Sequence, residues 1–375
     1  MKALKVALVM PNHFDINSSL NNFIKTYQYM IKNRNIEVTL FTDRKNDVKV
    51  RDFKIQKING LDYKTIFEKI LFVLGIPRFY YKDIVEKLKG FDVITANNPE
   101  FYAYACQAYK AAKKYNTRFI LRTSQTVEGF FLYNLTKYIV NPIAKKAYDY
   151  ASYTIFTNPQ AEERCLKLGL IDSKKKSVIT GHATDTATFK PIKVVKSKKT
   201  ILLSVGGLYK IKGHDIIIKA LKNIIDNGHK NTELWIVGKG YYENYLRNLV
   251  KKLKVEKNVK FLGSKGHNEL AKIYNMSGIF VLANYQEITP AVNEALACEK
   301  PVVVMECGGR DFVIPNESYG LVSKKLDIDD MAEKILLLIN NPKLAAKIAK
   351  NGRKRVLDNF SIERVADKLY RSFTA

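Results

Sequence analysis

The sequence predicts an α/β protein made of two doubly wound domains, each a parallel sheet covered by helices. Apolar segments of strand length alternate with helical segments along the whole chain, which is typical of strands joined by crossover helices. A basic, polar break, KVVKSKK at residues 193–199, interrupts this alternation near the middle, and the alternation then restarts. The length of 375 residues is sufficient for two domains of ordinary size.

Six segments of the first half read as strands. They are residues 4–10, 37–41, 92–95, 118–121, 153–156 and 177–180. Helical segments fill the gaps between them, among others at 20–33, 101–114 and 159–168. Each strand-like run is followed by a helix-like run, so the pattern favours parallel pairing.

The second half repeats this pattern and ends in helices. Its predicted strands are 200–205, 234–237, 259–262, 279–282 and 302–305, with helices at 214–226, 242–254, 268–275, 327–340, 342–359 and 361–372. We therefore predict domains at residues 1–192 and 200–355, joined by a linker at 193–199 and facing each other across a cleft. Residues 356–375 are predicted to pack back on the N-terminal domain.

Composition is typical of a soluble globular protein, with 46% hydrophobic and 26% charged residues. The longest apolar run, 70–77, is far shorter than the roughly 18 residues of a membrane span. The start, MKALKVALVMP, is too short and too charged for a signal peptide, which argues for a cytoplasmic protein. The scattered cysteines, at 106, 165, 298 and 307, predict reduced thiols without a metal site or disulfides.

The net charge of +27 allows several kinds of partner. Nucleic acid, an anionic membrane and phosphorylated ligands all attract such a surface, while a merely solvated, lysine-rich surface is an equally good interpretation. A nucleic-acid-binding or nucleic-acid-modifying protein is therefore one alternative. No basic motif interleaved with aromatic residues supports it, so we expect no nucleic acid partner.

Two glutamates mark the first candidate site, in YQEITPAVNEALACEKP at residues 285–301. Glu287 follows an apolar strand, a helix begins at about Thr289 or Pro290, and Glu294 lies in its first turns. Ligands of open α/β sheets bind at such strand ends, and a helix N-terminus favours anions. The alternative is a capping-region acid and a solvated helix residue.

Two glycine-containing turns form the rest of the candidate site. SVGGLYKIKGH at 204–214 carries Gly206, Gly207 and Lys212, and LWIVGKG at 234–240 closes on Gly238. Glycines allow the backbone to approach a phosphate, and Lys212 can supply charge to it. Each piece alone could be a tight turn. Together, in order and at successive strand ends, they predict a nucleotide site.

These motifs resemble the retaining glycosyltransferases of family 4, which have the GT-B fold. The C-terminal half shows VGGL…KG at 205–213, IVGKG at 236–240, FLG at 261–263, the paired glutamates and KPVV at 300–303. GG at 308–309 and ESYGLV at 317–322 continue the likeness. IEVTLFT, FDVITANNP and SVITGHATDTATFKP in the first half resemble the family more loosely.

Three positions depart from the family pattern. Gly207 stands where the family has a phosphate-side arginine, and RTSQT at 122–126 replaces a common histidine. Six residues separate the two glutamates instead of seven. Anchoring on the preceding strand aligns Glu287 with the first family glutamate, whereas anchoring on EALACEKP aligns Gln286; we favour Glu287 because a loop absorbs a deletion more readily than a strand.

The resemblance implies a hexosyltransferase that uses a nucleotide sugar, such as a UDP- or GDP-sugar, and retains the anomeric configuration without a metal or other cofactor. Lys212 and the backbone at Gly206 and Gly207 would stabilise the leaving diphosphate. Glu287 would act beside the donor sugar, and Glu294 would bind the ribose. Further donor-binding residues would be Gly238, Ile288 and Thr289. The acceptor would be a lipid-linked or polysaccharide precursor of the cell envelope.

His13, Asn97 and Arg122 are the acceptor-side candidates, because each falls at or just after a strand end of the first half. Residues 64–82, KTIFEKILFVLGIPRFYYK, are apolar with flanking cations. They suit either a buried crossover helix or contact with an anionic membrane, which would make the protein peripheral on the inner face. A sugar-nucleotide epimerase of the same fold is the alternative enzyme.

Overall fold

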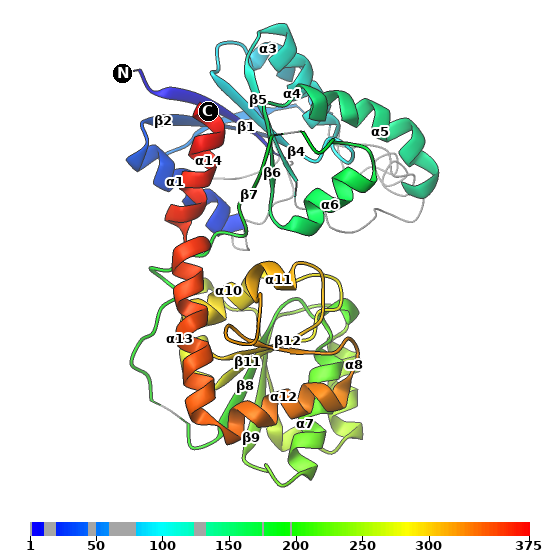
Figure 1. Ribbon diagram of the computed structural model, residues 1–375, viewed down its shortest axis with the longest axis vertical. Helices are drawn as coiled ribbons and strands as arrows, with labels where there is room; N and C mark the ends of the chain where they lie inside the picture. The colour runs from blue at the N-terminus through cyan, green and yellow to red at the C-terminus, as the bar shows by residue number, and fades with distance from the viewer. Residues whose placement is uncertain are drawn as a thin grey trace. The chain divides into compact units, whose positions relative to one another are not determined.

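The computed structural model describes residues 2–10, 20–43, 50–59, 80–123, 133–174, 176–195 and 197–375. The chain forms two compact units (Figure 1). Unit 1 comprises Met1–Ala183 and Ile362–Ala375, and unit 2 comprises Thr184–Ser361. Each contains a parallel sheet with helices on both faces, which confirms the predicted pair of doubly wound α/β domains.

The described part of unit 1 holds a seven-stranded sheet in the order β3-β2-β1-β4-β5-β6-β7. Its strands are β1 (Leu4–Val9), β2 (Ile36–Asp43), β3 (Lys54–Ile58), β4 (Val93–Asn97), β5 (Arg118–Thr123), β6 (Tyr153–Phe156) and β7 (Ser177–Ile179). The interior of β1 is buried on both sides, as expected for a parallel strand between two helical layers. β3 was missing from the sequence prediction.

The helices of unit 1 are α1 (Leu20–Asn33), α3 (Ile84–Lys87), α4 (Ala103–Lys114), α5 (Tyr133–Tyr150), α6 (Pro159–Lys167) and α14 (Ile362–Thr374). Buried alanines of α4 lie in the core under one face of the sheet, together with residues of α5 and α6. The opposite face packs against α1 and α14.

The C-terminal helix α14 lies beside α1 in unit 1 (Figure 1). Arg34, which directly follows α1, and Asp367 of α14 form an ion pair at 2.6 Å. The guanidinium of Arg118 also donates to the carbonyl oxygen of Phe373 at 3.0 Å. The end of the chain is thus tied to the first sheet by charge as well as by apolar packing.

Unit 2 contains a six-stranded parallel sheet in the order β10-β9-β8-β11-β12-β13. Its strands are β8 (Thr200–Val205), β9 (Thr232–Val237), β10 (Val259–Gly263), β11 (Ile279–Leu282), β12 (Val302–Met305) and β13 (Leu321–Ser323). The order reverses between β8 and β11, which makes the carboxyl ends of these two strands the point where ligands of such sheets bind. β13, three residues long, was not predicted.

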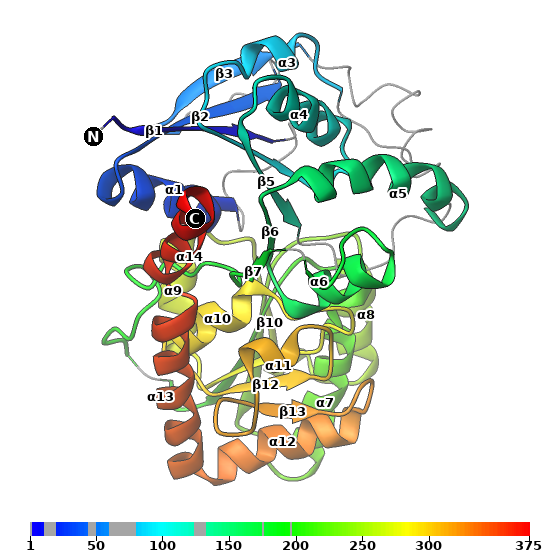
Figure 2. The same cartoon turned by 45° about the horizontal axis from the view of Figure 1, so that its top comes forward.

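Helices cover both faces of this second sheet. They are α7 (His214–Asp226), α8 (Glu243–Lys252), α9 (His267–Met276), α10 (Pro290–Ala297), α11 (Arg310–Val313), α12 (Ile328–Asn340) and α13 (Pro342–Asn359), with 3-10 turns η1 (Lys210–Lys212) and η2 (Glu256–Asn258). α12 packs beside α7, and α13 packs beside α10 (Figure 2).

The chain passes from unit 1 to unit 2 at Thr184 and returns after Ser361. These two crossing points form a short parallel bridge, and the amide of Thr184 donates to the carbonyl oxygen of Phe360 at 2.8 Å. The basic segment at 193–199 lies within unit 2. No helix in the described part of the chain is long and apolar enough to cross a membrane.

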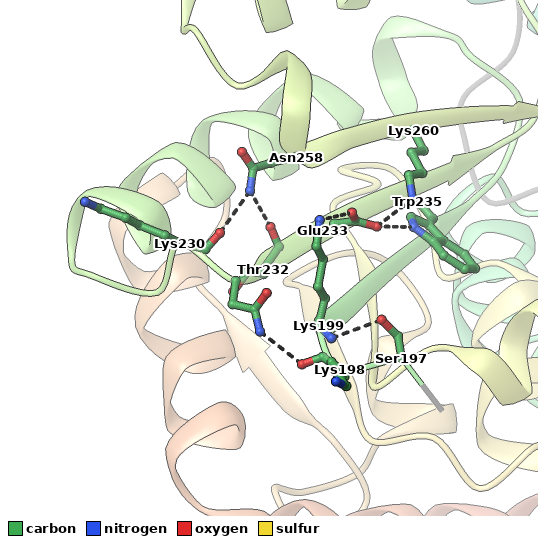
Figure 3. Close-up of polar contacts among 10 residues, drawn as sticks. Ser197, Lys198, Lys199, Lys230, Thr232, Glu233, Trp235, Asn258 and Lys260 are labelled. Carbon is green, nitrogen blue, oxygen red and sulfur yellow. Dashed lines mark hydrogen bonds and ion pairs between the residues drawn. The ribbon is translucent and has the colours of Figure 1, made fainter. Parts of the chain in front are cut away.

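Glu233 anchors the amino-terminal side of the second sheet (Figure 3). Its buried carboxylate accepts hydrogen bonds from Lys199 at 2.7 Å and from the indole of Trp235 at 3.0 Å. It also forms an ion pair with Lys260 at 2.9 Å. Burial alone would raise its pKa, but these partners outweigh burial and lower it to about 2. Glu233 therefore stays ionised across the physiological pH range.

Candidate functional site

The predicted donor residues gather where the strand order of unit 2 reverses. The loop after β8 carries Gly206, Gly207 and Lys212, and the loop after β11 leads through Glu287 into α10. These two loops touch, because the amide of Tyr285 donates to the carbonyl oxygen of Ile211 at 3.4 Å. Parallel strands bring residues distant in sequence to one edge, as the motif order predicted.

Two glycines permit the close packing of these loops. Gly213 has φ of 64°, and a Cβ there would lie 2.1 Å from the carbonyl oxygen of Ala283. Gly238 has φ of 147°, and a Cβ there would lie 1.9 Å from the carbonyl oxygen of Gly206. Any side chain at either position would force the loops after β8, β9 and β11 apart, so both glycines shape the edge.

The loop after β8 also accounts for Gly207. A Cβ at this position would lie 2.5 Å from the ring of Tyr209, so that ring occupies the space a side chain at 207 would need. The amide of Gly206 donates to the carbonyl oxygen of Val237 at 3.0 Å. Of the two glycines, Gly207 is therefore the one whose amide could reach a phosphate.

Lys212 is the cation at this edge. It ends η1, is half-buried, and has its pKa lowered by burial, against which the charges of Glu287 and Cys307 act. The ammonium of Lys212, the carboxylate of Glu287 and the thiol of Cys307 therefore lie near one another. A half-buried ammonium beside a carboxylate remains protonated at neutral pH and can meet an anion.

Glu287 is held by a short pairing between two loops. It forms a parallel bridge with Gly308, in which the amide of Ile288 donates to Gly308 at 2.9 Å and the amide of Gly308 donates to Gln286 at 2.9 Å. Gln286 is exposed, whereas Glu287 is half-buried on the side of Lys212. The GG motif at 308–309 thus positions the acidic loop.

Glu294 occupies the buried side of α10. It is 7% exposed, and the hydroxyl of Tyr274 lies 3.0 Å from its Oε2. Burial raises the pKa of Glu294 to about 7, although the hydrogen bond from Tyr274 acts in the opposite direction. No cation contacts it among the interactions found for the described residues. This carboxyl group can therefore change its charge near neutral pH.

The start of α10 lies between the two glutamates. The helix begins at Pro290, with Thr289 as its N-cap residue, as the sequence predicted. The Thr289 hydroxyl makes no capping bond and is buried without a hydrogen-bond partner in the described part of the chain. The Thr289 hydroxyl and the first amides of α10 can therefore hydrogen-bond to a ligand that carries negative charge or hydroxyl groups.

His214 is a site residue that the sequence interpretation passed over. It is 1% exposed, its Nδ1 lies 3.1 Å from the hydroxyl of Ser204, and its Nε2 lies 3.9 Å from the Cβ position of Gly206. Burial lowers its pKa to about 4, so the imidazole is neutral under the glycine loop. The sequence shows that His214 follows Gly213, but the contacts of its ring with Ser204 and Gly206 depend on the fold.

The acceptor-side candidates lie in unit 1. Asn97 ends β4 and pairs in register with Arg122 of β5, at the carboxyl edge of the first sheet. The guanidinium of Arg122 lies 4.3 Å from the ring centre of Phe23. His182, which the sequence interpretation missed, follows β7; burial and then the charge of Arg122 lower its pKa to about 4. His13, and residues 64–79 of the apolar segment 64–82, lie outside the described residues.

No group of three His, Cys, Asp or Glu side chains that could hold a metal ion occurs in the part of the chain that the structure describes. The groups found at the edge of unit 2 are the ammonium of Lys212, two carboxyl groups of different burial, backbone amides and a neutral imidazole. This set suits an anionic ligand that also presents hydroxyl groups.

Comparison with known families agrees with this geometry. Residues 185–355 match the family described as "Glycosyl transferases group 1". An uncharacterized glycosyltransferase of Haemophilus influenzae is 30% identical over 178 residues, which are 47% of this chain and 49% of the relative. The chain thus spans about half the length of this curated relative and of several others.

A second relative matches over most of its length. The N,N'-diacetylbacillosaminyl-diphospho-undecaprenol alpha-1,3-N-acetylgalactosaminyltransferase of Campylobacter jejuni is 29% identical over 84% of this chain and 88% of its own. Among solved structures, Anabaena HepE in complex with UDP has a TM-score of 0.77 at 13% identity, covering 99% of this chain and 100% of that chain. Residues 185–355 therefore match the group 1 glycosyltransferase family, and the chain as a whole has the GT-B type of fold.

Proposed function

We propose that this protein transfers a hexose from a nucleoside-diphosphate sugar to a lipid-linked or polysaccharide-precursor acceptor, with retention of the anomeric configuration. The observation that carries the proposal is the contact between the loop of Lys212 and the loop of Glu287 where the sheet of unit 2 reverses its strand order, with Glu294 on the helix that follows. The match of residues 185–355 to the family supports the reaction class, and the UDP complex of the Anabaena protein supports the donor class.

The leaving diphosphate would be stabilised by Lys212 and the backbone of the glycine loop. As the bond between the anomeric carbon and the diphosphate oxygen breaks, negative charge develops on the diphosphate. The ammonium of Lys212, the amide of Gly207 and the start of α10 are positioned to stabilise it. The acceptor hydroxyl then bonds to the anomeric carbon, and its proton leaves with the nucleoside diphosphate.

The two glutamates would have different roles because their surroundings differ. Glu287 is half-buried beside Lys212, where a carboxylate can stabilise a sugar that becomes cationic in the transition state. Glu294 is buried and has no cation partner among the described contacts, which suits two hydrogen bonds to the ribose hydroxyls. Ile288, Thr289 and Gly238 complete the proposed donor site.

The acceptor would be bound by unit 1. The name of the Campylobacter relative describes transfer to a sugar on diphospho-undecaprenol, and this supports a lipid-linked acceptor for the present chain. Asn97 and Arg122 are candidates because they end neighbouring strands. The orphaned Oδ1 atoms of Asn97 and Asn98, buried without a partner among the described residues, could accept hydrogen bonds from sugar hydroxyls.

The experiment is a panel of UDP- and GDP-sugars, each incubated with and without an undecaprenyl-diphosphate-linked sugar. We expect release of nucleoside diphosphate that depends on the acceptor, together with a new glycolipid of retained configuration. Consumption of the donor without any acceptor would instead indicate an epimerase-type reaction. No stabilisation by any nucleotide sugar would contradict the proposal, because a ligand at 100 times its Kd stabilises by about 2.7 kcal/mol.

Glu287→Gln tests the assignment of the catalytic loop. We expect kcat to fall by about 100-fold or more with little change in donor KM, because the lost charge acts mainly in the transition state. Gln286→Ala is the matched control, since Gln286 is the adjacent, exposed residue that an alternative alignment would choose. A large loss in the control with none in Glu287→Gln would reverse the assignment.

A further inference from the structure

The outer face of α5 exposes large apolar side chains to solvent. Tyr138 is 77% exposed, Ile139 is 70% exposed and Ile143 is 52% exposed. Pro142 and Lys146 lie on the same stripe, since positions 138, 139, 142, 143 and 146 follow the helical repeat. Single exposed apolar residues are ordinary, but a contiguous apolar stripe on one helix indicates a contact surface.

This stripe is not the face that holds α5 on unit 1. The inner face includes Val140, Ala144 and Tyr148, which are 4%, 0% and 0% exposed. Ala144 and Tyr148 belong to the apolar core of unit 1. The helix is therefore apolar on both sides, and folding of unit 1 accounts for only one of them.

A groove extends the outer face of α5 toward the end of α6. It has a volume of about 430 Å³ and is lined by Tyr138, Pro142, Lys145, Lys167 and Leu168, among others. Lys145 pairs with Asp149 at 2.6 Å and Lys167 pairs with Glu163 at 2.7 Å. The side chains of Lys145 and Lys167 are 43% and 73% exposed, so the apolar floor of the groove has cations at its rim.

The position of α5 relates this face to the edge of the first sheet. β5 ends at Thr123, beside Asn97 of β4, and α5 runs back to the start of β6. Because crossover helices run opposite to the strands they connect, the first half of α5 lies toward the carboxyl edge of the sheet. Tyr138 and Ile139 belong to that half, and Ile143 lies just past the middle of the helix.

We propose that the outer face of α5 and the groove beside it dock on an anionic lipid bilayer. Tyr138, Ile139 and Ile143 enter the boundary between head groups and acyl chains. Lys145, Lys146 and Lys167 meet the lipid phosphates. Apolar side chains with basic neighbours are what a helix lying in the plane of such an interface requires. The docking goes beyond the proposed transfer reaction and does not depend on which sugar is moved.

Charge favours a bilayer over a second copy of the chain. A two-fold interface would bring the same face of two molecules together and gather Lys145, Lys146 and Lys167 of both copies in one interface. Each copy also carries a net charge of +27, so two copies repel. An anionic surface is instead attracted both by these lysines and by the positive net charge of the whole chain.

Vesicle flotation tests the proposal. The wild-type chain should float with vesicles of phosphatidylcholine and phosphatidylglycerol but not with phosphatidylcholine alone. Binding should fall about tenfold when salt rises from about 50 to about 500 mM, because screening shortens the reach of the charges. Ile139→Ser with Ile143→Ser should lower binding by about tenfold or more, since two inserted apolar side chains are lost.

Leu337→Ser is the matched control. Leu337 lies on α12 of unit 2 and is 44% exposed, so its replacement removes exposed apolar surface away from α5. The control should bind vesicles like the wild type. Donor binding, measured separately with nucleotide sugars, should be unchanged in every variant, so a failure of docking is distinguishable from a failure of the proposed transferase function.

Unchanged binding in the double variant, or equal binding to vesicles without anionic lipid, would overturn the proposal. A wild-type dimer in sedimentation that the double variant dissolves would also overturn it, in favour of self-association through this face. If the double variant melts at a lower temperature than the wild type, vesicle binding by the Lys146→Glu variant tests the proposal instead. This substitution changes one exposed residue and should still lower vesicle binding several-fold, about the value of one cation at the surface.

Discussion

Glu233 and Glu294 are both buried carboxyl groups of unit 2, yet their pKa values shift in opposite directions. They are 4% and 7% exposed. Lys199, Trp235 and Lys260 surround Glu233 and lower its pKa to about 2, whereas Glu294 has the hydroxyl of Tyr274 beside it and a pKa of about 7. Their exposure is similar, but the partners of Glu233 hold its pKa down, whereas burial raises the pKa of Glu294.

The opposite pKa shifts distinguish a carboxyl group that stabilises the fold, Glu233, from one that we propose binds a ligand, Glu294. Glu233 joins β9 to the start of β8 and to β10, at the end of the sheet away from the carboxyl edge. Glu294 lies at the carboxyl edge, and a buried carboxyl group without a cation is unfavourable until a partner arrives. We infer that Glu233 stabilises the fold and that Glu294 forms hydrogen bonds to the donor when the donor binds.

Glu294→Gln should give the largest effect on donor binding. Glutamine keeps the shape and the acceptor for Tyr274 but cannot carry charge, so two charge-assisted hydrogen bonds weaken. We expect donor affinity to fall about 10- to 100-fold, from roughly 1.5–3 kcal/mol of lost interaction. Calorimetric titration with the preferred nucleotide sugar measures this. The melting temperature should stay the same or rise, and a marked drop would place Glu294 with Glu233 among structural residues.

Lys212→Ala should weaken donor binding by about tenfold or more and slow transfer. Its ammonium is half-buried at the carboxyl edge, where a contact with a diphosphate is only partly screened. Lys210→Ala is the matched control, because Lys210 lies in the same 3-10 turn and is exposed. Equal losses in both variants would indicate a general electrostatic effect without a specific phosphate contact.

Glu233→Gln should lower stability by about 1–2 kcal/mol and leave donor affinity unchanged. The estimate is modest because Lys199 and Lys260 are 47% and 51% exposed, and solvent screens their attraction. Urea unfolding and the same titration measure the two quantities. A loss of donor affinity as large as that of Glu294→Gln would remove the distinction between the two carboxyl groups.

The pH dependence of stability should carry opposite contributions from the two glutamates. The lowered pKa of Glu233 gives stability that is present above the ordinary value near 4.5 and lost as pH falls toward about 2. The raised pKa of Glu294 gives stability that is present below about 4.5 and lost as pH rises to about 7. Urea unfolding of Glu294→Gln should therefore show a flatter profile between about pH 5 and 7 than that of the wild type.

The sequence predicted the fold well because its strands are long, apolar and regularly separated by helices. β3 and β13 escaped because neither is a continuous apolar run: β3 reads KIQKI with exposed positions, and β13 has three residues. The helix start at Pro290 was predicted because proline and the preceding threonine are local signals. Local chemistry of this kind is visible without a structure.

The parts of the site that escaped prediction depend on contacts between distant residues. His214 matters because the fold sets it under Gly206, and Tyr209 because its ring fills the space beside Gly207. Glu233 fell just outside the predicted strand at 234–237 and carries no motif. Its partners Lys199 and Lys260 lie on neighbouring strands, so only the sheet reveals the cluster.

Proton release on donor binding tests the central claim most directly. With a pKa of about 7, Glu294 is partly protonated at pH 7 in the free protein and would have to ionise to bind the ribose as proposed. Calorimetry in buffers of different ionisation enthalpy should show release of roughly half a proton per nucleotide sugar bound at pH 7 by the wild type and by Glu233→Gln. Glu294→Gln should release none. Release of the same fraction by Glu294→Gln, or none by the wild type, would contradict the assignment of Glu294 to the donor.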